Sequence, residues 1–221
     1  MVEKFLIGIS PRDYQKQIFE SCKDKNSLIV LPTGIGKTLI GLMLVIHRMQ
    51  VYPLKKILFL APTRPLAQQH FDYFKKHLPE LFAQINLFTG KIKPEERKKI
   101  WQRADIIFST PQCISNDLKK NMYSLNEVSL LIEDEAHRCV KNYAYNFVAE
   151  KYKNQGENIQ IIGLTASPGT DKKTIKKTAI TIINKKLLPP DRRLSEGSSW
   201  TPTKELEVPT EDKYFATATY M

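Results

Sequence analysis

Six short apolar runs, separated by longer amphipathic stretches, constrain the fold of this chain most strongly. The runs occupy residues 28–31, 57–61, 85–88, 106–109, 129–133 and 159–164. Most are continuously apolar, which is typical of parallel strands buried on both faces. The amphipathic stretches lie at residues 37–50, 65–77, 94–103, 112–121, 140–153 and 171–184. This repeated strand–helix order predicts an α/β fold, in which helices cover both faces of a doubly wound, mostly parallel sheet.

A phosphate-binding loop is indicated directly after the first predicted strand, where residues 31–38 read LPTGIGKT. The end of this segment matches the pattern G-x-x-x-x-G-K-[ST], whereas Leu31 stands at the first glycine position. Two glycines let backbone N–H groups converge on one centre, and the following helix directs its positive end there. We expect Lys37 to reach the β- and γ-phosphates and Thr38 to ligate Mg²⁺. The residues expected to line the nucleotide are Leu31, Pro32, Thr33, Gly34, Ile35, Gly36, Lys37 and Thr38.

A cluster of carboxylates ends the fifth predicted strand, in the segment LLIEDEAHR at residues 130–138. Burying carboxylates at a strand end costs free energy unless a cation pairs with them, and a phosphate-bound Mg²⁺ can be that cation. Asp134 is therefore expected to bind Mg²⁺ directly or through its water, and Glu135 is expected to orient and deprotonate an attacking water molecule. His137 lacks H-E-x-x-H spacing, so we expect a hydrogen-bonding link rather than a metal ligand. Glu133 is expected to face solvent or a basic neighbour.

These two segments together resemble the first RecA-like domain of a superfamily 2 helicase of the DEAH/DExH kind. Five further segments extend the resemblance in the family order: PRDYQ (11–15), APTRPLAQQH (61–70), FTG (88–90), STPQ (109–112) and LTASPG (164–169). The residues of these motifs are most similar to those of the branch that holds the archaeal Hef helicase–nuclease and its Fanconi-anaemia M relatives. RNA-sensing and Dicer-type helicases share much of it.

The resemblance implies a P-loop NTPase that uses ATP, with Mg²⁺ as the accompanying metal. In the family, Gln15 of the first segment would read the adenine edge, and Arg12 would pack near the base. The implied catalytic set is Lys37, Asp134, Glu135 and His137.

The other matched segments predict contacts with a nucleic-acid backbone. Thr63 and Arg64 follow a predicted strand and open a helix, where amides, hydroxyls and guanidinium groups bind phosphates. Gly90 lets nucleic acid approach the main chain, and Thr110 and Pro111 stand at another helix start. Each feature alone is ordinary turn or helix-entry chemistry, but their joint order favours a functional role. The resemblance implies that they line one groove that follows the nucleic-acid backbone and contacts no base edges. The resemblance also implies coupling between nucleotide and groove by two residues, Thr165 and Ser167.

The charge of the chain agrees with a polyanionic partner. Its 34 Lys and Arg residues and 23 Asp and Glu residues give a net charge of +11. Such a surplus attracts nucleic acid or anionic lipid. No apolar run approaches the roughly 18 residues of a membrane span, so we expect no membrane partner. Three widely spaced cysteines predict neither disulfides nor a zinc site, which favours a reducing, cytoplasmic location, at the nucleoid if the source is prokaryotic.

The domain organisation is expected to change near residue 189. Residues 1–188 are expected to form the ATP-binding domain, and residues 189–221 an irregular tail that begins a linker. Within the tail, residues 204–208 (KELEV) can form one strand. The lysines of residues 171–186 either contact phosphates or line a solvated helix.

The resemblance implies that a second RecA-like domain completes the site with transition-state arginines. This chain is therefore expected to bind ATP and DNA, whether single-stranded, forked or branched, and to turn ATP over weakly by itself. Two alternatives stay open. One is a nucleic-acid and ATP-binding module without turnover, and the other is a helicase domain directed to double-stranded RNA.

Overall fold

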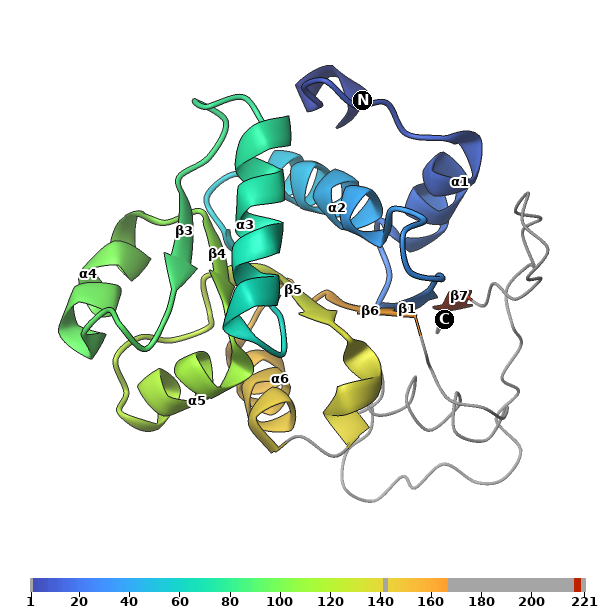
Figure 1. Cartoon of the computed structure of the whole chain (residues 1–221). Coiled ribbons are helices and arrows are strands. Elements are labelled where there is room, and N and C mark those ends of the chain that lie inside the picture. The colour runs from blue at the N-terminus through green and yellow to red at the C-terminus, as the bar shows by residue number, and fades with distance from the viewer. Residues whose placement is uncertain (1, 141–142, 167–216, 220–221) are drawn as a thin grey trace, which may run out of the picture.

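The computed structural model describes residues 2–140, 143–166 and 217–219. Within them, one sheet has the strand order β3-β4-β2-β5-β6-β1-β7 (Figure 1). The first six strands pair in parallel, and β7 pairs antiparallel with β1 at the edge. The strands are β1 (Ser27–Val30), β2 (Lys56–Leu60), β3 (Ile85–Phe88), β4 (Ile106–Ser109), β5 (Val128–Asp134), β6 (Ile161–Thr165) and β7 (Thr217–Thr219).

Helices cover both faces of the sheet. They are α1 (Asp13–Cys22), α2 (Lys37–Val51), α3 (Arg64–His77), α4 (Pro94–Arg103), α5 (Pro111–Lys119) and α6 (Tyr143–Gln155), with 3₁₀ turns η1 (Val2–Phe5) and η2 (Ala136–Val140). In Figure 1, α2 lies above the line of strands and α3 stands upright in front of it, whereas α5 and α6 lie below it. No helix among the described residues combines the length and the apolar character needed to cross a bilayer.

Alternate side chains of the parallel strands β1–β6 enter two separate cores. In β2, Ile57 and Phe59 pack with α1, α2 and α3, whereas Leu58 and Leu60 pack with α4, α5 and α6. All four side chains are fully buried. Burial on both faces explains why the strands read as continuous apolar runs rather than as alternating ones.

The predicted doubly wound α/β fold is confirmed, and the six predicted strands lie within two residues of the observed ones. Helix α1 and the two 3₁₀ turns, η1 and η2, are missing from the prediction. Helix α1 carries apolar residues at helical spacing (Tyr14, Ile18, Cys22), but this segment was interpreted only as a motif. Turn η2, with five residues, is too short for a helical period of apolar residues to be recognised in its sequence. The observed α6 begins at Tyr143 instead of residue 140.

Three residues of the predicted irregular tail form strand β7, so that part of the expectation is wrong. Their backbone pairs with β1 over Ser27–Ile29 and extends the sheet by one strand. The predicted helix at 171–184, the lysines of 171–186 and the predicted strand at 204–208 lie outside the described residues.

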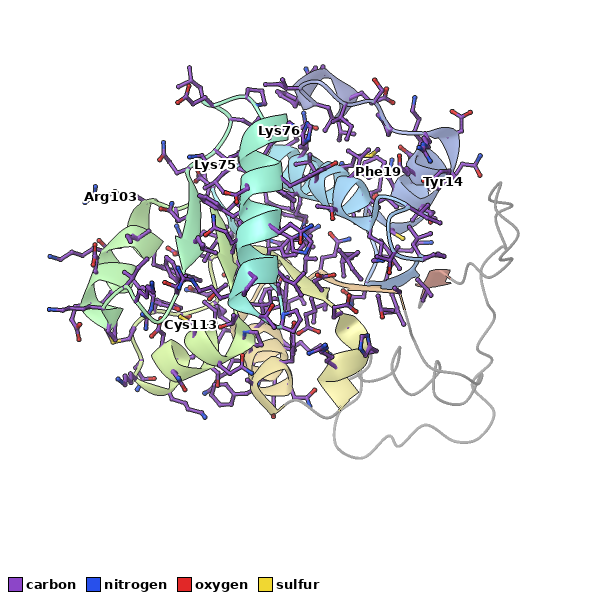
Figure 2. All side chains as sticks on the ribbon, in the orientation of Figure 1. Tyr14, Phe19, Lys75, Lys76, Arg103 and Cys113 are labelled. Carbon is purple, nitrogen blue, oxygen red and sulfur yellow. The ribbon has the colours of Figure 1, made fainter. Side chains whose placement is uncertain are left out.

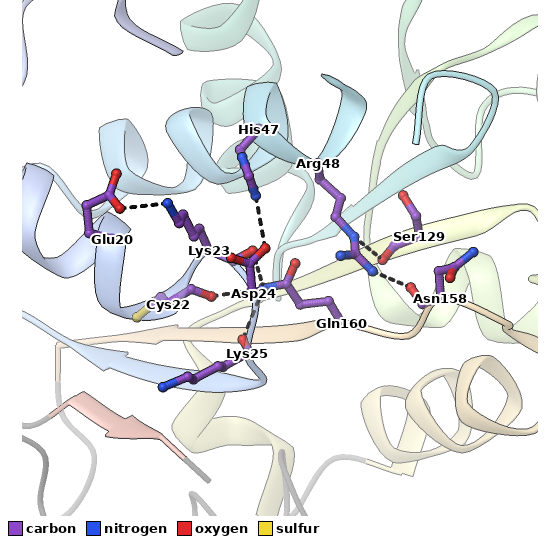
Figure 3. Close-up of polar contacts among 10 residues, drawn as sticks. All are labelled: Glu20, Cys22, Lys23, Asp24, Lys25, His47, Arg48, Ser129, Asn158 and Gln160. Atoms are coloured by element: carbon purple, nitrogen blue, oxygen red, sulfur yellow. Dashed lines mark hydrogen bonds and ion pairs between the residues drawn. The ribbon is translucent and has the colours of Figure 1, made fainter. Parts of the chain in front are cut away.

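Side-chain hydrogen bonds to backbone carbonyls stabilise the amino edge of the sheet (Figure 3). The Gln160 amide nitrogen, just before β6, lies 2.9 Å from the carbonyl oxygen of Cys22 and 3.0 Å from that of Lys25. The Nε of Arg48, on α2, donates to the carbonyl of Ser129 at 2.9 Å, and its Nη2 donates to that of Asn158. These contacts satisfy backbone carbonyls where helices and strands end. The carbonyls at this edge therefore find hydrogen-bond donors within the chain, in the side chains of Gln160 and Arg48.

Charged side chains at the helix ends lie on the outer surface. Lys75 and Lys76 occupy the last turn of α3 and Arg103 the last turn of α4, and all three are exposed (Figure 2). Cations in the last helical turn interact favourably with the negative end of the helix dipole.

Candidate functional site

The parallel sheet brings the sequence motifs together at its carboxyl edge. Strands β3, β4 and β2 are neighbours, and the segments that follow them hold Gly90, Thr110 and Thr63. Strands β5, β6 and β1 form the other half and lead into Asp134, Thr165 and the loop at 31–38. Ligands of open α/β sheets bind at this edge. The order of the strands therefore places the predicted nucleic-acid residues in one half of this edge, called the nucleic-acid half, and the predicted nucleotide residues in the other, called the nucleotide half.

The packing of the sheet explains why position 31, the first glycine position of the phosphate-binding pattern, holds leucine. Leu31 is fully buried in the core, and its N–H donates to the carbonyl of Thr165 at 3.0 Å. Position 31 thus continues the pairing of β1 with β6, where a large apolar residue packs better than glycine. The turn itself uses Gly34 at φ +83° and Gly36 at φ +86°, a backbone region that favours glycine.

Lys37 turns back over this loop. Its Nζ donates to the carbonyl of Leu31 at 2.8 Å and to that of Pro32 at 3.3 Å. Burial lowers the pKa of Lys37, while the nearby charges of Asp134 and Glu135 act in the opposite direction. The ammonium group of Lys37 therefore lies within electrostatic reach of both carboxylates.

The PRDYQ segment packs directly against the loop. The Tyr14 hydroxyl donates to the carbonyl of Ile35 at 2.7 Å, and the Gln15 amide lies 3.3 Å from the carbonyls of Ile35 and Gly36. The other end of the Gln15 amide accepts the Arg12 N–H at 2.8 Å. Gln15 therefore supports the loop in this structure, and its adenine-reading role stays a prediction. Tyr14 was missed, although it adjoins Gln15 in the motif.

The acidic end of β5 turns sharply. Asp134 ends the strand, and Glu135 adopts φ +50°, a strained conformation for a residue with a side chain. The N–H of Arg138 donates to the Glu135 carbonyl at 2.9 Å and closes the turn. The turn separates the two carboxylates, so that Glu135 is partly exposed while Asp134 is buried.

Glu133 does not face solvent, as the sequence had suggested it could, because it is only 1% exposed. Turn η2 folds back over it, and the Cys139 thiol lies 3.3 Å from its Oε2 as a donor. Burial, followed by the charge of Glu133, raises the pKa of the Cys139 thiol. Glu133 is thus a buried acceptor behind the nucleotide half of the edge.

His137 connects two of the motifs. Its Nδ1 lies 3.0 Å from the Thr165 hydroxyl and 3.2 Å from Oε2 of Glu135. Thr165 is fully buried at the end of β6. This geometry agrees with a hydrogen-bonding link. Ser167, the other predicted coupling residue, lies outside the described residues.

One buried pair at the site was not predicted. The Nε2 of His70, on α3, lies 2.8 Å from Oδ2 of Asp134. The only signal for it is a histidine at the end of APTRPLAQQH, and a lone histidine on an amphipathic helix does not reveal its partner. The pair joins the helix that follows β2 to the acidic end of β5.

The predicted nucleic-acid residues differ in accessibility. Thr63 and Arg64 are exposed, with Thr63 as the N-cap of α3, accepting the Leu66 N–H at 3.5 Å. Gly90 is exposed, and a Cβ at this position would meet nothing within 4 Å. Thr110 caps α5 without using its side chain, which leaves its hydroxyl available. Pro111 is buried, so it shapes the helix start rather than presenting a contact surface.

The donors at the site suit a metal that arrives with phosphates. The described residues contain no cluster of three or more His, Cys, Asp or Glu side chains able to hold a metal. Mg²⁺ commonly binds through one or two protein oxygens together with substrate phosphates and water. The Thr38 hydroxyl and the Asp134 carboxylate fit that requirement.

Comparisons with known proteins agree with this geometry. A family model described as DEAD/DEAH box helicase matches residues 12–175. Among solved structures, the Pyrococcus furiosus Hef helicase domain is 48% identical with a TM-score of 0.74, covering 78% of this chain and 36% of that one.

Two curated relatives extend the comparison. MJ1505 of Methanocaldococcus jannaschii, provisionally named an ATP-dependent RNA helicase, is 41% identical over 163 residues, covering 74% of this chain and 20% of the relative. The ATP-dependent DNA helicase MPH1 of Candida albicans is 35% identical over 160 residues, covering 72% of this chain and 13% of the relative. The chain thus spans a fifth or less of either relative.

Proposed function

The chain belongs to the DEAD/DEAH box helicase family, and we propose that it is the ATP-binding motor domain of a DNA helicase or translocase that acts on forked or branched DNA in repair. Its similarity to the Hef helicase domain and to MPH1, which is named a DNA helicase, supports DNA as the substrate. The provisional name of MJ1505 favours RNA as the second candidate.

The observation that carries the proposal is a loop with two glycines at positive φ, over which Lys37 folds back, at the same sheet edge as Asp134 and Glu135. The loop amides and Lys37 would hold the phosphates, and Thr38 and Asp134 would hold Mg²⁺. Bound Mg²⁺ would neutralise charge on the phosphates. Glu135, partly exposed beside the loop, would orient a water molecule and accept its proton.

The nucleic acid would lie along the adjoining half of the edge. Thr63, Arg64 and the backbone at Gly90 are exposed there, and the Thr110 hydroxyl is not used as a helix cap. All four would meet phosphates rather than base edges, so binding would be independent of sequence and would weaken with salt. The +11 net charge supports the same partner.

The motor would need a second RecA-like domain. We propose that residues 1–188, together with strand β7 at residues 217–219, form the first such domain, and that the rest of residues 189–221 leads towards the second. The chain covers 36% of the Hef helicase-domain chain, which leaves room for another domain of similar size. That domain would supply arginines across the nucleotide, and an arginine finger is worth about 10³–10⁵ in rate. A role on cellular DNA would also place the protein inside the cell, in the cytoplasm or nucleoid.

The test is ATP binding and ATP turnover by the 221-residue chain, with and without forked DNA, beside Glu135→Gln as a matched control. We expect Mg²⁺-dependent ATP binding, slow turnover, and a further loss of about 10²–10⁴ in turnover for Glu135→Gln, the range of general-base catalysis. Absence of nucleotide binding would refute the proposal. Turnover that rises when the second domain is added in trans would distinguish a motor from a passive binding module.

A matched pair of single strands tests the nucleic acid. The two oligonucleotides have one sequence, one as RNA and one with hydrogen in place of each 2′-hydroxyl. Equal or tighter binding of the deoxy strand is expected for a DNA motor, whereas binding lost with the 2′-hydroxyl would favour the RNA candidate.

A further inference from the structure

We propose that His70 is a positioning residue for the nucleotide site, which holds the Asp134 carboxylate in the orientation that receives the phosphate-bound Mg²⁺. The inference rests on the proposed function, because it assigns a task to a residue that supports the same site. It adds α3, a helix of the nucleic-acid half, to the parts that shape the metal site.

Burial, a hydrogen bond and ring packing together restrict the orientation of the His70 side chain. Its Nε2 lies 2.8 Å from Oδ2 of Asp134, and the two residues are only 7% and 6% exposed. An ionised carboxylate only accepts hydrogen bonds, so Nε2–H is the donor. The imidazole ring also packs against Phe59 of β2, with ring centroids 4.6 Å apart.

The second ring nitrogen identifies the tautomer. Nδ1 of His70 is buried and has no hydrogen-bond partner among the described residues. A proton on Nδ1 would be a buried, unsatisfied donor, which is costly. The tautomer with its proton on Nε2 leaves only a lone pair at Nδ1 and keeps the bond to Asp134.

Asp134 is therefore fixed at two points. His70 holds Oδ2 of its side chain, and the Tyr145 hydroxyl of α6 donates to its backbone carbonyl at 2.9 Å. With Oδ2 held by His70, Oδ1 is the carboxylate oxygen that would be left to receive a metal or its water. Hydrogen-bond partners that orient metal ligands typically contribute 10–100-fold to metal affinity or activity.

His77 offers a matched control on the same helix. It is 8% exposed, and its ring packs against Tyr73 at 4.5 Å. Its Nδ1 lies 2.8 Å from the carbonyl of Ile7, at the end of α3 remote from Asp134. A loss that reflects only a buried histidine in α3 would appear in His77 variants as well.

The experiment uses the full 221-residue chain and three variants, His70→Phe, His70→Gln and His77→Phe. The Mg²⁺ concentration that half-saturates binding of a fluorescent ATP analogue is measured, together with binding of the same analogue in EDTA. We expect His70→Phe to raise the Mg²⁺ requirement about 10–100-fold, with binding in EDTA unchanged. His70→Gln, whose Nε2 can still donate, should stay close to the parent chain, as should His77→Phe.

A second readout needs no ligand, and comparison with His70→Gln identifies the His70 signals among those of the four histidines. ¹⁵N NMR of histidine-labelled chain without Mg²⁺ should show His70 protonated at Nε2 and unprotonated at Nδ1. The inference is overturned if His70→Phe binds nucleotide with an unchanged Mg²⁺ requirement, if His77→Phe raises it equally, or if NMR finds the opposite tautomer. Absence of Mg²⁺-dependent nucleotide binding by the parent chain would instead refute the proposed function, and this inference with it.

Discussion

Arg97 of α4 and Asp117 of α5 form a buried ion pair, with Nε of Arg97 2.7 Å from Oδ2 of Asp117. The guanidinium also donates to the backbone carbonyls of Thr89 and Ile92. One side chain thus holds the loop that contains Gly90 against the helix that begins after Thr110. Two of the proposed nucleic-acid segments keep their spacing through this pair.

Asp117→Asn should destabilise the chain strongly. Breaking a buried pair by neutralising one partner leaves an uncompensated charge and typically costs about 3–5 kcal/mol. Urea unfolding measures the change, and Asp72→Asn, at an exposed position on α3, is the control, expected to stay within about 0.5 kcal/mol. Equal stabilities of the two variants would show that the pair contributes nothing to the fold.

Gly36→Ala should impair the nucleotide loop more than Gly34→Ala. Both residues have positive φ, for which a side chain costs about 1–2 kcal/mol. A Cβ on Gly36 would also lie 2.3 Å from the Gln15 amide nitrogen, whereas a Cβ on Gly34 would meet nothing within 4 Å. The displaced amide loses its contacts with the loop.

Unfolding free energies and affinities for an ATP analogue measure this difference. In a Gln15→Ala background the two alanine variants should become equivalent, since the amide is no longer there to be displaced. A difference that persists without the Gln15 side chain would locate the defect elsewhere.

Thr165→Val should weaken communication between nucleotide and DNA while nucleotide binding stays within about threefold, because the hydrogen bond to His137 is lost but the backbone bond from Leu31 of the loop to Thr165 remains. The measurement is the DNA dissociation constant with and without a non-hydrolysable ATP analogue. Coupling between two sites typically changes affinity about 5–150-fold, and the factor should fall towards one. Ser129→Ala removes a buried hydroxyl at the opposite edge and should keep the coupling. Intact coupling in Thr165→Val would exclude this hydroxyl as the link.

Alkaline pH should destabilise the chain partly through Cys139. Burial raises the pKa of this thiol above its ordinary 9.0, so the unfolded chain loses the proton first. Stability from this group is full below pH 9 and falls above it, with a slope of about 1 kcal/mol per pH unit. Urea unfolding at pH 8, 9 and 10 should give a shallower decline for Cys139→Ala. Parallel declines would show that the thiol ionises alike in both states.

The candidate site was partly predictable because some of its chemistry is local in sequence. The glycines and Lys37 sit within one loop, and their spacing indicates phosphate binding before any contact is known. The pairs His70–Asp134 and Arg97–Asp117, in contrast, join residues 64 and 20 positions apart. No spacing rule connects them, since only the packing of helices on the sheet brings them together.

The sequence by itself determined the doubly wound sheet, since continuous apolar runs alternate with amphipathic helices that can cover both faces of the strands. It also determined which short segments follow each strand. The tertiary structure alone decided that Gln15 supports the loop, that Glu133 is buried and that His70 holds Asp134. Each of these outcomes depends on which surfaces meet when α1, η2 and α3 pack, and the free energy of that packing is shared among residues distant in the chain.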